Sequence, residues 1–528
     1  MLIPTPEEFR RLASKGNLVP VRAELLADTE TPLSAYQKLT RTQPGNTFLF
    51  ESVEGGEHIG RYSFIGLNPR AILTVCGDRM VIERGKESKK SRAPADPLQA
   101  AKELLAPFRP VRLPGLPRFI GGLVGYLGFE YVCRIEPVPQ PPIDDLGLPL
   151  LKYLLIDTLV IFDRARQIIQ IVANAHIEGN PDAAYADAAA RIRVIERALA
   201  MPLASPPAAL PTEIPDAAFS SNMPKDEYLS MVTRGKKYIK QGDIFQFVPS
   251  QRFSAPTQAT PIEIYRALRT INPSPYMFLM RFPDFSLVGA SPEIHVRCEE
   301  GLVEIRPIAG TRRRGATAEE DEHLEKDLLA DQKERAEHLM LVDLARNDLG
   351  RVCEFNSVTV PQFMTVERYS HVMHIVSQVT GRLRPGQDAF DVMRASFPAG
   401  TLSGAPKIRA MQIISELERR VRGPYGGALG YFDFNGNLDT CITIRTLVLK
   451  DGVAHVQAGG GVVDDSTPEG EYQETVNKAR ALVKALALAE SFRGKPKASP
   501  PGRKPQGRAK AARLARKSAV VPKSKRRS

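Results

Sequence analysis

Residues 428–464, with the sequence ALGYFDFNGNLDTCITIRTLVLKDGVAHVQAGGGVVD, give the clearest indication of fold class. Apolar and β-branched residues dominate the runs 428–448 and 453–464, and we predict strands there. Thr467-Pro468 follows, and a hydroxyl cap with proline at the first helical position predicts the start of a last helix. Strands outnumber strand–helix–strand alternations along the chain, and we find no internal repeat. The sequence therefore predicts an α+β fold with mostly antiparallel sheet.

Further elements are expected upstream of this segment. Alternating or continuous apolar runs predict strands at 47–53, 61–67, 153–163 and 243–253. Apolar residues at helical spacing predict helices at 182–200, 225–241 and 326–349, the last being the longest candidate.

The length of 528 residues allows three or four domains, or one large enzyme built from two interleaved parts. Five prolines in 201–217 predict an extended linker. We therefore divide the chain into an N-terminal region (1–200), the linker (201–217), a second domain (218–492) and a C-terminal tail (493–528).

The net charge of +12 is concentrated in the tail. Residues 493–528 contain fourteen Lys and Arg and no Asp or Glu, which leaves 58 basic and 60 acidic residues in 1–492. With few aromatic residues, the tail cannot bury enough apolar surface to fold alone. We expect a disordered, solvated extension, for which non-specific binding to nucleic acid through phosphates is the alternative.

The composition is that of an ordinary globular protein, with 43% hydrophobic and 25% charged residues, which excludes fibrous and wholly disordered classes. The five cysteines are odd in number and never spaced as CxxC, so neither a disulfide framework nor a cysteine zinc site is expected. The first residues, MLIPTPEEFRRL, lack the apolar core of a signal peptide, and no apolar run approaches the roughly 20 residues that span a bilayer. We expect a cytoplasmic protein without membrane association.

Two carboxylate pairs are candidate metal ligands. Glu334 and Glu337 are three residues apart on one predicted helix, and Glu471 and Glu474 are three apart on the last helix, so each pair shares a helix face. Brought together, the pairs would suit Mg²⁺, which prefers oxygen ligands and often takes one or two protein carboxylates. Spacing alone favours solvated helix faces, with Lys478 as the i+4 partner of Glu474.

Three further patterns are weak by themselves. QAGGGVV at 457–463 precedes the last helix, and its glycines would let backbone amides approach a carboxylate, although it matches neither a P-loop nor a dinucleotide fingerprint. GTRRRG at 310–315 indicates a solvated basic turn more than a phosphate loop. His371 and His374 lack the neighbours of a metal pair.

Eight stretches resemble, in the same order, the chorismate-utilising enzymes and most of all the large subunits of anthranilate synthases. They are GASPE (289–293), RPIAGT (306–311), ERAEHLMLVDLARNDLGR (334–351), ERYSHVMHIVSQV (367–379), PAGTLSGAPKIRAM (398–411), LDTCITIRT (438–446), QAGGGVV (457–463) and EYQETVNKAR (471–480). With FLFES (48–52) and NPSPYMF (272–278), the resemblance extends from about residue 20 to about residue 490.

The resemblance implies two orthogonally packed, mostly antiparallel sheets with helices outside, and a cleft for chorismate and Mg²⁺. Glu337 and Glu474 would bind the metal, which would hold the ring carboxylate, with Glu334 and Glu471 beside them. Arg445 and the amides of the glycine run would take the enolpyruvyl carboxylate. The positions implied to contact chorismate are Gly310, Thr311, Thr401, Tyr425, Arg445, Gly459, Gly460, Gly461 and Lys478.

The same resemblance implies a reaction. Glu293 would be the general acid that protonates the departing C4 hydroxyl, and His374 would assist the later steps that give an aromatic ring. Salicylate and isochorismate synthases carry a lysine base where this chain has Gln246, and aminodeoxychorismate synthases typically carry a lysine nucleophile where it has Ala309. Ammonia is then the expected nucleophile, and the products are anthranilate and pyruvate. The enzyme would be a Mg²⁺-dependent carbon–oxygen lyase, with aminodeoxychorismate synthase component I as the alternative. A nucleic-acid-associated protein on a degenerate enzyme fold is the rival from another class, but all four glutamates are present.

Regulation and partners are also implied. Glu51, Ser52, Pro275, Tyr276 and Met277 match a tryptophan feedback pocket, in which Glu51 would pair with the ligand's ammonium group. No cysteine stands in the Gly-rich elbow of a class I amidotransferase, so ammonia would come from a separate glutaminase subunit (component II) in a heteromeric complex.

Overall fold

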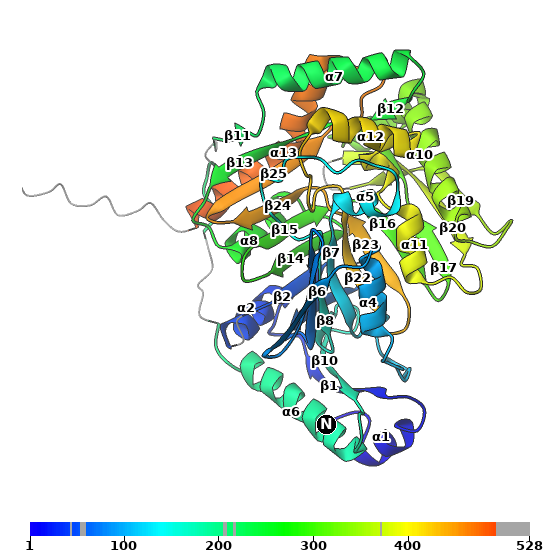
Figure 1. Cartoon of the computed structure of the whole chain (residues 1–528). Coiled ribbons are helices and arrows are strands. Elements are labelled where there is room, and N and C mark those ends of the chain that lie inside the picture. Colours follow the sequence, from blue (N-terminus) through cyan, green and yellow to red (C-terminus); the bar gives the residue numbers. More distant parts are fainter. Residues whose placement is uncertain (43–44, 53–59, 204–208, 215–217, 370–371, 493–528) are drawn as a thin grey trace, which may run out of the picture. The chain divides into compact units, whose positions relative to one another are not determined.

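Two large antiparallel β-sheets form the centre of the computed structural model (Figure 1), which describes residues 1–42, 45–52, 60–203, 209–214, 218–369 and 372–492. Within these residues the first sheet has 11 strands, in the order β1 (Leu18–Leu26), β10 (Ile168–His176), β9 (Thr158–Asp163), β3 (Tyr62–Leu67), β2 (Thr47–Glu51), β14 (Tyr276–Arg281), β15 (Ser286–Ser291), β24 (Thr446–Lys450), β25 (Val453–Gly459), β13 (Ser250–Pro256) and β11 (Ser220–Ser221).

The second sheet has 12 strands among the described residues. Their order is β18 (Ile308–Arg313), β20 (Val372–Arg382), β17 (Leu302–Ile305), β16 (Ile294–Glu299), β23 (Leu438–Ile442), β22 (Ala428–Asp433), β7 (Gly122–Leu127), β8 (Leu151–Ile156), β4 (Ala71–Cys76), β5 (Arg79–Arg84) and β6 (Glu87–Arg92), with β19 (Thr359–Arg368) beside β20. A two-stranded ribbon pairs β12 (Gln246–Phe247) with β21 (Gly404–Ala405).

Helices flank both sheets. They are α1 (Pro6–Leu12), α2 (Pro32–Thr42), α4 (Leu98–Leu105), α5 (Val132–Ile135), α6 (Pro181–Leu199), α7 (Lys225–Lys240), α8 (Pro261–Ile271), α9 (Ala318–Ala330), α10 (Gln332–Gly350), α11 (Ala389–Ser396), α12 (Lys407–Glu418) and α13 (Pro468–Ser491), with 3₁₀ turns η1 (Phe129–Tyr131) and η2 (Gly400–Leu402). No helix of the described residues is both long and apolar enough to cross a membrane.

The two sheets share a buried core. Phe48 and Phe278 of the first sheet pack in one cluster with Tyr126 and Leu429 of the second. The opposite face of the first sheet packs against α2, α6, α8 and α13, and that of the second packs against α4, α10 and α11. The α+β class with two large antiparallel sheets is confirmed.

The N-terminal region and the second domain are interleaved. In the first sheet, β2 pairs with β3 on one side and with β14 on the other, so residues 47–51 join strands from both parts of the sequence. Residues 1–492 form one compact unit, as in the interleaved arrangement that the length allowed. The tail and residues 204–208 and 215–217 of the expected linker lie outside the described residues.

The described chain crosses directly between the two sheets four times, at β3–β4, β8–β9, β15–β16 and β23–β24. The last two lie next to each other, and we call them the first and the second crossing. β15 ends in the first sheet at Ser291 and β16 begins in the second at Ile294, whereas β23 leaves the second sheet and β24 enters the first. The amide of Ile442 donates to the carbonyl of Glu293 (3.0 Å), and the amide of Ala290 donates to the carbonyl of Arg445 (3.1 Å). Segments 292–293 and 443–445 therefore lie side by side where the sheets meet.

Most expected elements are present. The helices predicted at 182–200 and 225–241 are α6 and α7, and the last helix begins at Pro468, with the Thr467 hydroxyl accepting from the amide of Gly470 (3.2 Å). Three predictions are wrong. The helix expected at 326–349 is two helices, because Asp331 caps α10. The strand expected at 153–163 is two strands in different sheets, β8 and β9, and the strand expected at 243–253 is divided into β12 and β13 at Val248-Pro249.

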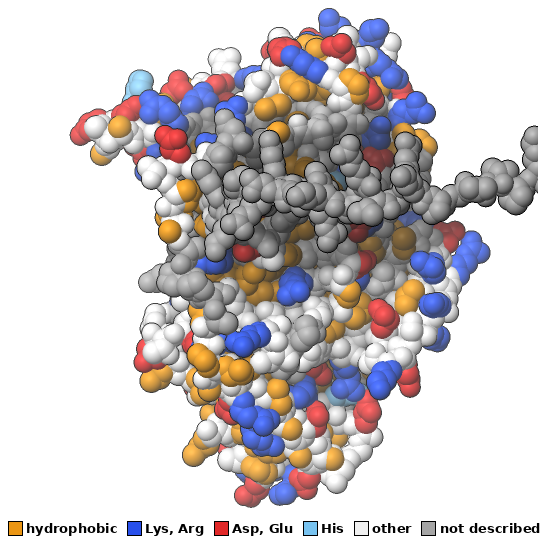
Figure 2. All heavy atoms as spheres, turned by 90° about the vertical axis from the view of Figure 1, so that its left-hand side faces the viewer, with side chains coloured by type: hydrophobic (Ala, Val, Ile, Leu, Met, Phe, Trp, Pro, Cys, Tyr) orange, Lys and Arg blue, Asp and Glu red, His pale blue; other side chains and the backbone are white. Residues whose placement is uncertain are grey.

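Surface charge on the described residues is mixed. On the face shown in Figure 2, Lys and Arg side chains are interspersed with Asp and Glu, without a large patch of one sign among the described residues. This agrees with the near balance of 58 basic and 60 acidic residues in 1–492.

Candidate active site

A cavity of about 490 Å³ lies where the chain crosses between the sheets. It gathers fifteen of the sequence-predicted residues, from segments far apart in the chain. They are Gln246, Glu293, Gly310, Thr311, Glu334, Glu337, His374, Thr401, Tyr425, Arg445, Gly459, Gly461, Glu471, Glu474 and Lys478.

The carboxylates of α10 and α13 meet across the glycine run. A Cβ added at Gly460 would lie 2.7 Å from Glu471 Oε2 and 3.5 Å from Glu474 Oε1, and one at Gly461 would lie 3.6 Å from Glu337 Oε1. A Cβ at Gly461 would also lie 2.4 Å from Gln246 Nε2, so a larger residue at either position would displace a side chain of the site, Glu471 at Gly460 and Gln246 at Gly461. Glycine therefore lets the backbone approach carboxylates from two helices. Gly460, the remaining predicted substrate contact, belongs to this site although it is not part of the cavity lining.

Two of these four glutamates, Glu334 and Glu471, have a raised pKa. Burial raises the pKa of Glu334, and the charges of Glu337 and Asp331 raise it further. Burial also raises the pKa of Glu471, whose Oε2 is buried and has no hydrogen-bond partner among the described residues. Glu337 accepts from Gln246 Nε2 (3.2 Å), and Glu474 pairs with Lys478 (2.7 Å).

The donor set fits Mg²⁺ bound together with a substrate. No three His, Cys, Asp or Glu side chains among the described residues are close enough to hold a metal by themselves. Mg²⁺ is commonly held by one or two protein carboxylates, with water and substrate oxygens completing its octahedron. One carboxylate from each helix, together with the unpartnered oxygen of Glu471, suits that mode.

Glu293 lies at the first crossing between the sheets and is 8% exposed. Burial raises its pKa to about 8, against the opposing effects of the Thr401 hydroxyl and of the positive charges on Lys478 and Arg445. A carboxyl group in this environment is protonated at neutral pH and can donate a proton.

Arg445 lies at the second crossing in a left-handed backbone conformation (φ 48°), which is uncommon for a residue with a side chain. Burial lowers the pKa of its guanidinium, while the charge of Glu293 raises it. Lys478, also in the wall, donates to the carbonyl of Gly459 (3.0 Å). Two cations and the glycine amides thus face one cavity, which suits a dicarboxylate.

His374 is held in one tautomer. Its Nδ1 lies 2.9 Å from the carbonyl oxygen of Gly310 and 3.1 Å from Thr311 Oγ1. A carbonyl can only accept, so Nδ1 carries the hydrogen, and Nε2 of the neutral ring is free to accept a proton. Burial lowers the pKa of this imidazole, which favours the neutral form. His371 lies outside the described residues.

The arginines of GTRRRG do not form the solvated turn expected from the sequence. They lie in and just after β18, and each pairs with acids of the α9–α10 region: Arg312 with Asp331 (2.8 Å), Arg313 with Glu320 (2.5 Å) and Arg314 with Asp321 (2.9 Å). Because these arginines already pair with carboxylates, the segment is not a loop with free donors for a phosphate.

Sequence reasoning missed two polar residues of the cavity wall, Lys333 and Gln457. Lys333 directly precedes Glu334, and Gln457 stands two residues before the glycine run, so nearness to a motif was the available signal.

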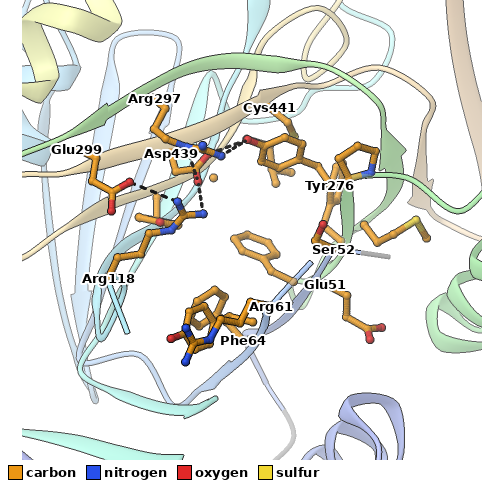
Figure 3. A pocket seen from close by; sticks show the side chains of 18 of the residues that line it. Glu51, Ser52, Arg61, Phe64, Arg118, Tyr276, Arg297, Glu299, Asp439 and Cys441 are labelled. Atoms are coloured by element: carbon orange, nitrogen blue, oxygen red, sulfur yellow. Dashed lines mark hydrogen bonds and ion pairs between the residues drawn. The ribbon is translucent and has the colours of Figure 1, made fainter. Parts of the chain in front are cut away.

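A second cavity, of about 450 Å³, contains the predicted feedback residues (Figure 3). Glu51, Ser52, Pro275, Tyr276 and Met277 all line it. On its other side are Arg118, Arg297 and Asp439, and Asp439 accepts from the Tyr276 hydroxyl (2.9 Å), from Arg118 (3.2 Å) and from Arg297 (3.2 Å).

The Glu51 carboxylate points away from this second cavity (Figure 3). It is fully buried and accepts from the hydroxyl of Tyr265 (2.7 Å), from Arg269 (3.3 Å) and from Arg164 (3.4 Å). The expected pairing with a ligand's ammonium group therefore has no basis in this conformation, because the carboxylate already has three donors on the far face of β2.

Comparison with known proteins defines the class. The family model for chorismate binding enzymes matches residues 45–484, and the chain belongs to that family. Within the family it resembles anthranilate synthase component 1. It is 47% identical to that protein from Acetivibrio thermocellus (93% of this chain, 100% of the relative) and 50% identical to that from Pseudomonas putida (93% and 99%). The crystal structure of anthranilate synthase component I from Streptococcus pneumoniae matches with a TM-score of 0.71 at 38% identity, covering 80% of this chain and 92% of that one.

Proposed function

We propose that this chain is the large subunit of an anthranilate synthase and converts chorismate and ammonia into anthranilate and pyruvate. The observation that carries the proposal is the content of the catalytic cavity. It combines a buried acid with a raised pKa (Glu293), a neutral histidine (His374) and a run of glycine amides that can bind a carboxylate. It also has Gln246 and Ala309 at the two positions where lysine would support the addition of water or attack by the lysine itself.

The first half-reaction requires an acid and a nucleophile. Ammonia adds at C2 of chorismate as the C4 hydroxyl leaves, and the Glu293 carboxyl donates the proton that makes the leaving group water. Gln246 cannot remove a proton from water, so hydration does not compete by that route. Arg445, Lys478 and the glycine amides hold the carboxylates of the substrate.

The second half-reaction requires a base. Removal of the C2 proton and cleavage of the bond from C3 to the enolpyruvyl oxygen leave the aromatic ring. The leaving group is the enolate of pyruvate, which takes up one proton at its terminal carbon to give pyruvate. Nε2 of His374 is the acceptor for the C2 proton, since Nδ1 is held on Gly310. Mg²⁺, bound by Glu337 and Glu474, would neutralise the ring carboxylate and fix its orientation.

We propose that the ammonia comes from a separate glutaminase subunit. None of the five cysteines lines the catalytic cavity. Burial raises the thiol pKa of Cys133 to about 12 and those of Cys298 and Cys353 to about 11, whereas a nucleophilic cysteine needs a lowered value. We further propose that the second cavity binds tryptophan as a feedback inhibitor, that the tail is a solvated extension, and that the enzyme works in the cytoplasm.

Product analysis tests the proposal. The purified chain, supplied with chorismate, Mg²⁺ and an ammonium salt, should release anthranilate and pyruvate in equal amounts, and glutamine should not replace ammonium. Accumulation of 4-amino-4-deoxychorismate instead would identify the alternative enzyme. Efficient use of glutamine by the single chain would refute the separate subunit.

A further inference from the structure

Arg422 is a charged side chain inside the protein, with only 2% of the residue exposed. It follows Glu418, the last residue of α12, by four positions. Its Nε donates to Glu418 Oε2 (2.9 Å) and its Nη2 to Glu418 Oε1 (2.5 Å), while the ring of Phe129 lies 4.4 Å beneath the guanidinium carbon. The pair is therefore a bidentate ion pair removed from water.

The remaining donors of Arg422 reach the wall of the catalytic cavity. Nη1 donates to the carbonyl of Leu402 (3.0 Å), and Nη2 donates to the carbonyl of Val248 (2.6 Å). The guanidinium carbon also lies 5.6 Å from the ring centre of Tyr425. Val248, Leu402 and Tyr425 all line the cavity, and they come from three separate segments.

Glu418 extends the contacts to a fourth segment. Its Oε1 accepts from the amide (2.7 Å) and the hydroxyl (3.0 Å) of Ser250. Ser250 Oγ in turn accepts from Gln457 Nε2 (2.8 Å), and Gln457 lines the cavity two residues before the glycine run. One ion pair therefore contacts, directly or through Ser250, four parts of the wall around the substrate.

The attraction between the two charges alone does not explain this pair. A buried ion pair can often be replaced by apolar side chains of similar volume without loss of stability, because the desolvation of both charges offsets their attraction. An apolar pair, however, would leave the carbonyls of Val248 and Leu402 without donors. Lysine could not replace the fork either, since an ammonium group is a point charge that cannot bind a carboxylate side-on and two carbonyls at once.

We propose that Arg422, oriented by Glu418, is a positioning residue of the catalytic cavity, which fixes Val248, Leu402, Tyr425 and Gln457 relative to one another. The inference rests on the proposed function, since the consequence is measured on chorismate turnover. Arg422 acts through these wall residues and does not itself touch the substrate.

The test substitutes Arg422→Lys in the full chain, which keeps the buried charge and removes the fork. A misplacement of about 1 Å can cost about 100-fold in rate, so kcat/KM for chorismate should fall by about 10- to 100-fold. Arg191→Lys is the matched control. Arg191 pairs with Asp157 (2.9 Å) and donates to the carbonyl of Asn174 (3.0 Å), and none of the three lines the catalytic cavity.

A milder pair of variants keeps the test decisive if Arg422→Lys does not fold. Ser250→Ala removes only the hydroxyl between Glu418 and Gln457, and should raise KM for chorismate by about threefold to tenfold, the size expected for one lost hydrogen bond. Ser254→Ala removes a hydroxyl from the same strand, where it bonds His455 Nδ1 (2.8 Å) outside the cavity, and should leave KM unchanged.

KM separates positioning from a mere loss of folded protein, because the amount of active enzyme changes the maximal rate and not KM. A normal KM in Ser250→Ala, or the same loss of kcat/KM in Arg191→Lys as in Arg422→Lys, would overturn the inference. The unsubstituted chain is assayed alongside. Absence of anthranilate formation there would refute the proposed function, whereas normal formation with unaffected variants refutes only the positioning role.

Discussion

Glu337 and Glu474 are the side chains whose substitution tests the metal proposal most directly. Glu337→Gln or Glu474→Gln keeps the shape and removes one negative ligand, so turnover at limiting Mg²⁺ should fall by at least about tenfold to a hundredfold. The measurement is the rate of anthranilate formation against Mg²⁺ concentration.

Glu469→Gln provides the control for this prediction. Glu469 lies on the same helix, α13, but pairs with Lys225 at the surface (2.7 Å, 62% exposed). Its substitution should leave the Mg²⁺ dependence unchanged. Near-normal turnover at limiting Mg²⁺ in both cavity variants would contradict the assignment of Glu337 and Glu474 as metal ligands.

Glu293 predicts the pH dependence of the reaction. Its pKa of about 8 means that the acid form prevails at neutral pH and is lost as pH rises through about 8. Free ammonia, the nucleophile, increases with pH. Turnover with ammonium salts should therefore rise with pH, level off near pH 8 and then fall, and Glu293→Gln should lose most activity at every pH.

The raised pKa of Glu293 also makes the free energy of unfolding depend on pH. Between its ordinary pKa of 4.5 and about 8, the folded chain holds a proton on Glu293 that the unfolded chain has lost. The contribution of this group to the free energy of unfolding is therefore lost progressively as pH rises through that interval. Denaturant unfolding of the chain and of Glu293→Gln at several pH values measures the difference, and an identical pH slope would place the pKa of Glu293 near its ordinary value.

Residues in the stretches that carry the family resemblance could be predicted to lie in the cavity, and residues that act across the fold could not. The resemblance alone implied the places of Glu293 and Arg445, whereas the glycine run also has the backbone freedom that a close approach requires. Arg422, by contrast, lies outside every stretch that carries the resemblance, and its role depends on carbonyls at positions 248 and 402. The direction of the Glu51 side chain likewise depends on donors from α8 and the β9–β10 turn.

At the scale of elements, the junction between α9 and α10 shows how one capping residue places a functional side chain. Asp331 Oδ1 accepts from the amides of Lys333 (2.9 Å) and Glu334 (3.1 Å), and Asp331 Oδ2 accepts from Arg312 (2.8 Å). An Asp with Glu three residues later is a signature of a helix start. The apolar spacing continues across this position, and for that reason one helix was predicted at 326–349. The cap directs Glu334 toward the cavity.

Removal of this cap should affect both stability and metal use. Asp331→Ala is expected to cost about 1 kcal/mol of unfolding free energy and to weaken the response to Mg²⁺ by up to about tenfold, because Glu334 is no longer held. Asp388→Ala is the control, since Asp388 caps α11 in the same way, accepting from the amides of Phe390 (2.9 Å) and Asp391 (3.1 Å). An equal change of Mg²⁺ response in both variants would contradict the assignment of Glu334 to the site.

Extended structure could be predicted from apolar patterns, but the crossings between sheets could not. The run 428–448 contains β22, β23 and β24, of which the first two belong to one sheet and the third to the other. A period of two is the same in either sheet, so the pattern does not reveal where the chain changes sheets. The cavity forms at those changes.

At the scale of the whole molecule, the basic tail is expected to be separable from the enzyme. Residues 493–528 lie outside the described residues, and residues 1–492 form a compact unit without them. A chain ending at 492 should keep its turnover and its response to tryptophan. Any affinity of the full chain for DNA should disappear with the truncation and weaken steeply with salt. Loss of activity on truncation would show that the tail contributes to the enzyme.

The two cavities are linked by short continuous segments of chain. Tyr276, which lines the second cavity, pairs with Ser291, two residues before Glu293. Cys441, in the same cavity, lies on β23, which ends at Ile442, three residues before Arg445. The Ser291 hydroxyl donates to the carbonyl of Ile442 (2.7 Å) and so joins the two segments. A ligand that shifts one cavity can therefore change the other through backbone that both share.

Feedback by tryptophan should accordingly be a reciprocal coupling between separate sites. Tryptophan should weaken chorismate binding, and chorismate should weaken tryptophan binding by the same factor, typically about 5- to 150-fold. Ser52 is buried in the wall of the second cavity, and Ser52→Phe should fill that cavity without touching the catalytic one. The variant should keep most of its uninhibited turnover and lose sensitivity to tryptophan. Turnover measured against tryptophan concentration decides the matter, because an unchanged inhibition midpoint in a folded variant means that tryptophan binds elsewhere.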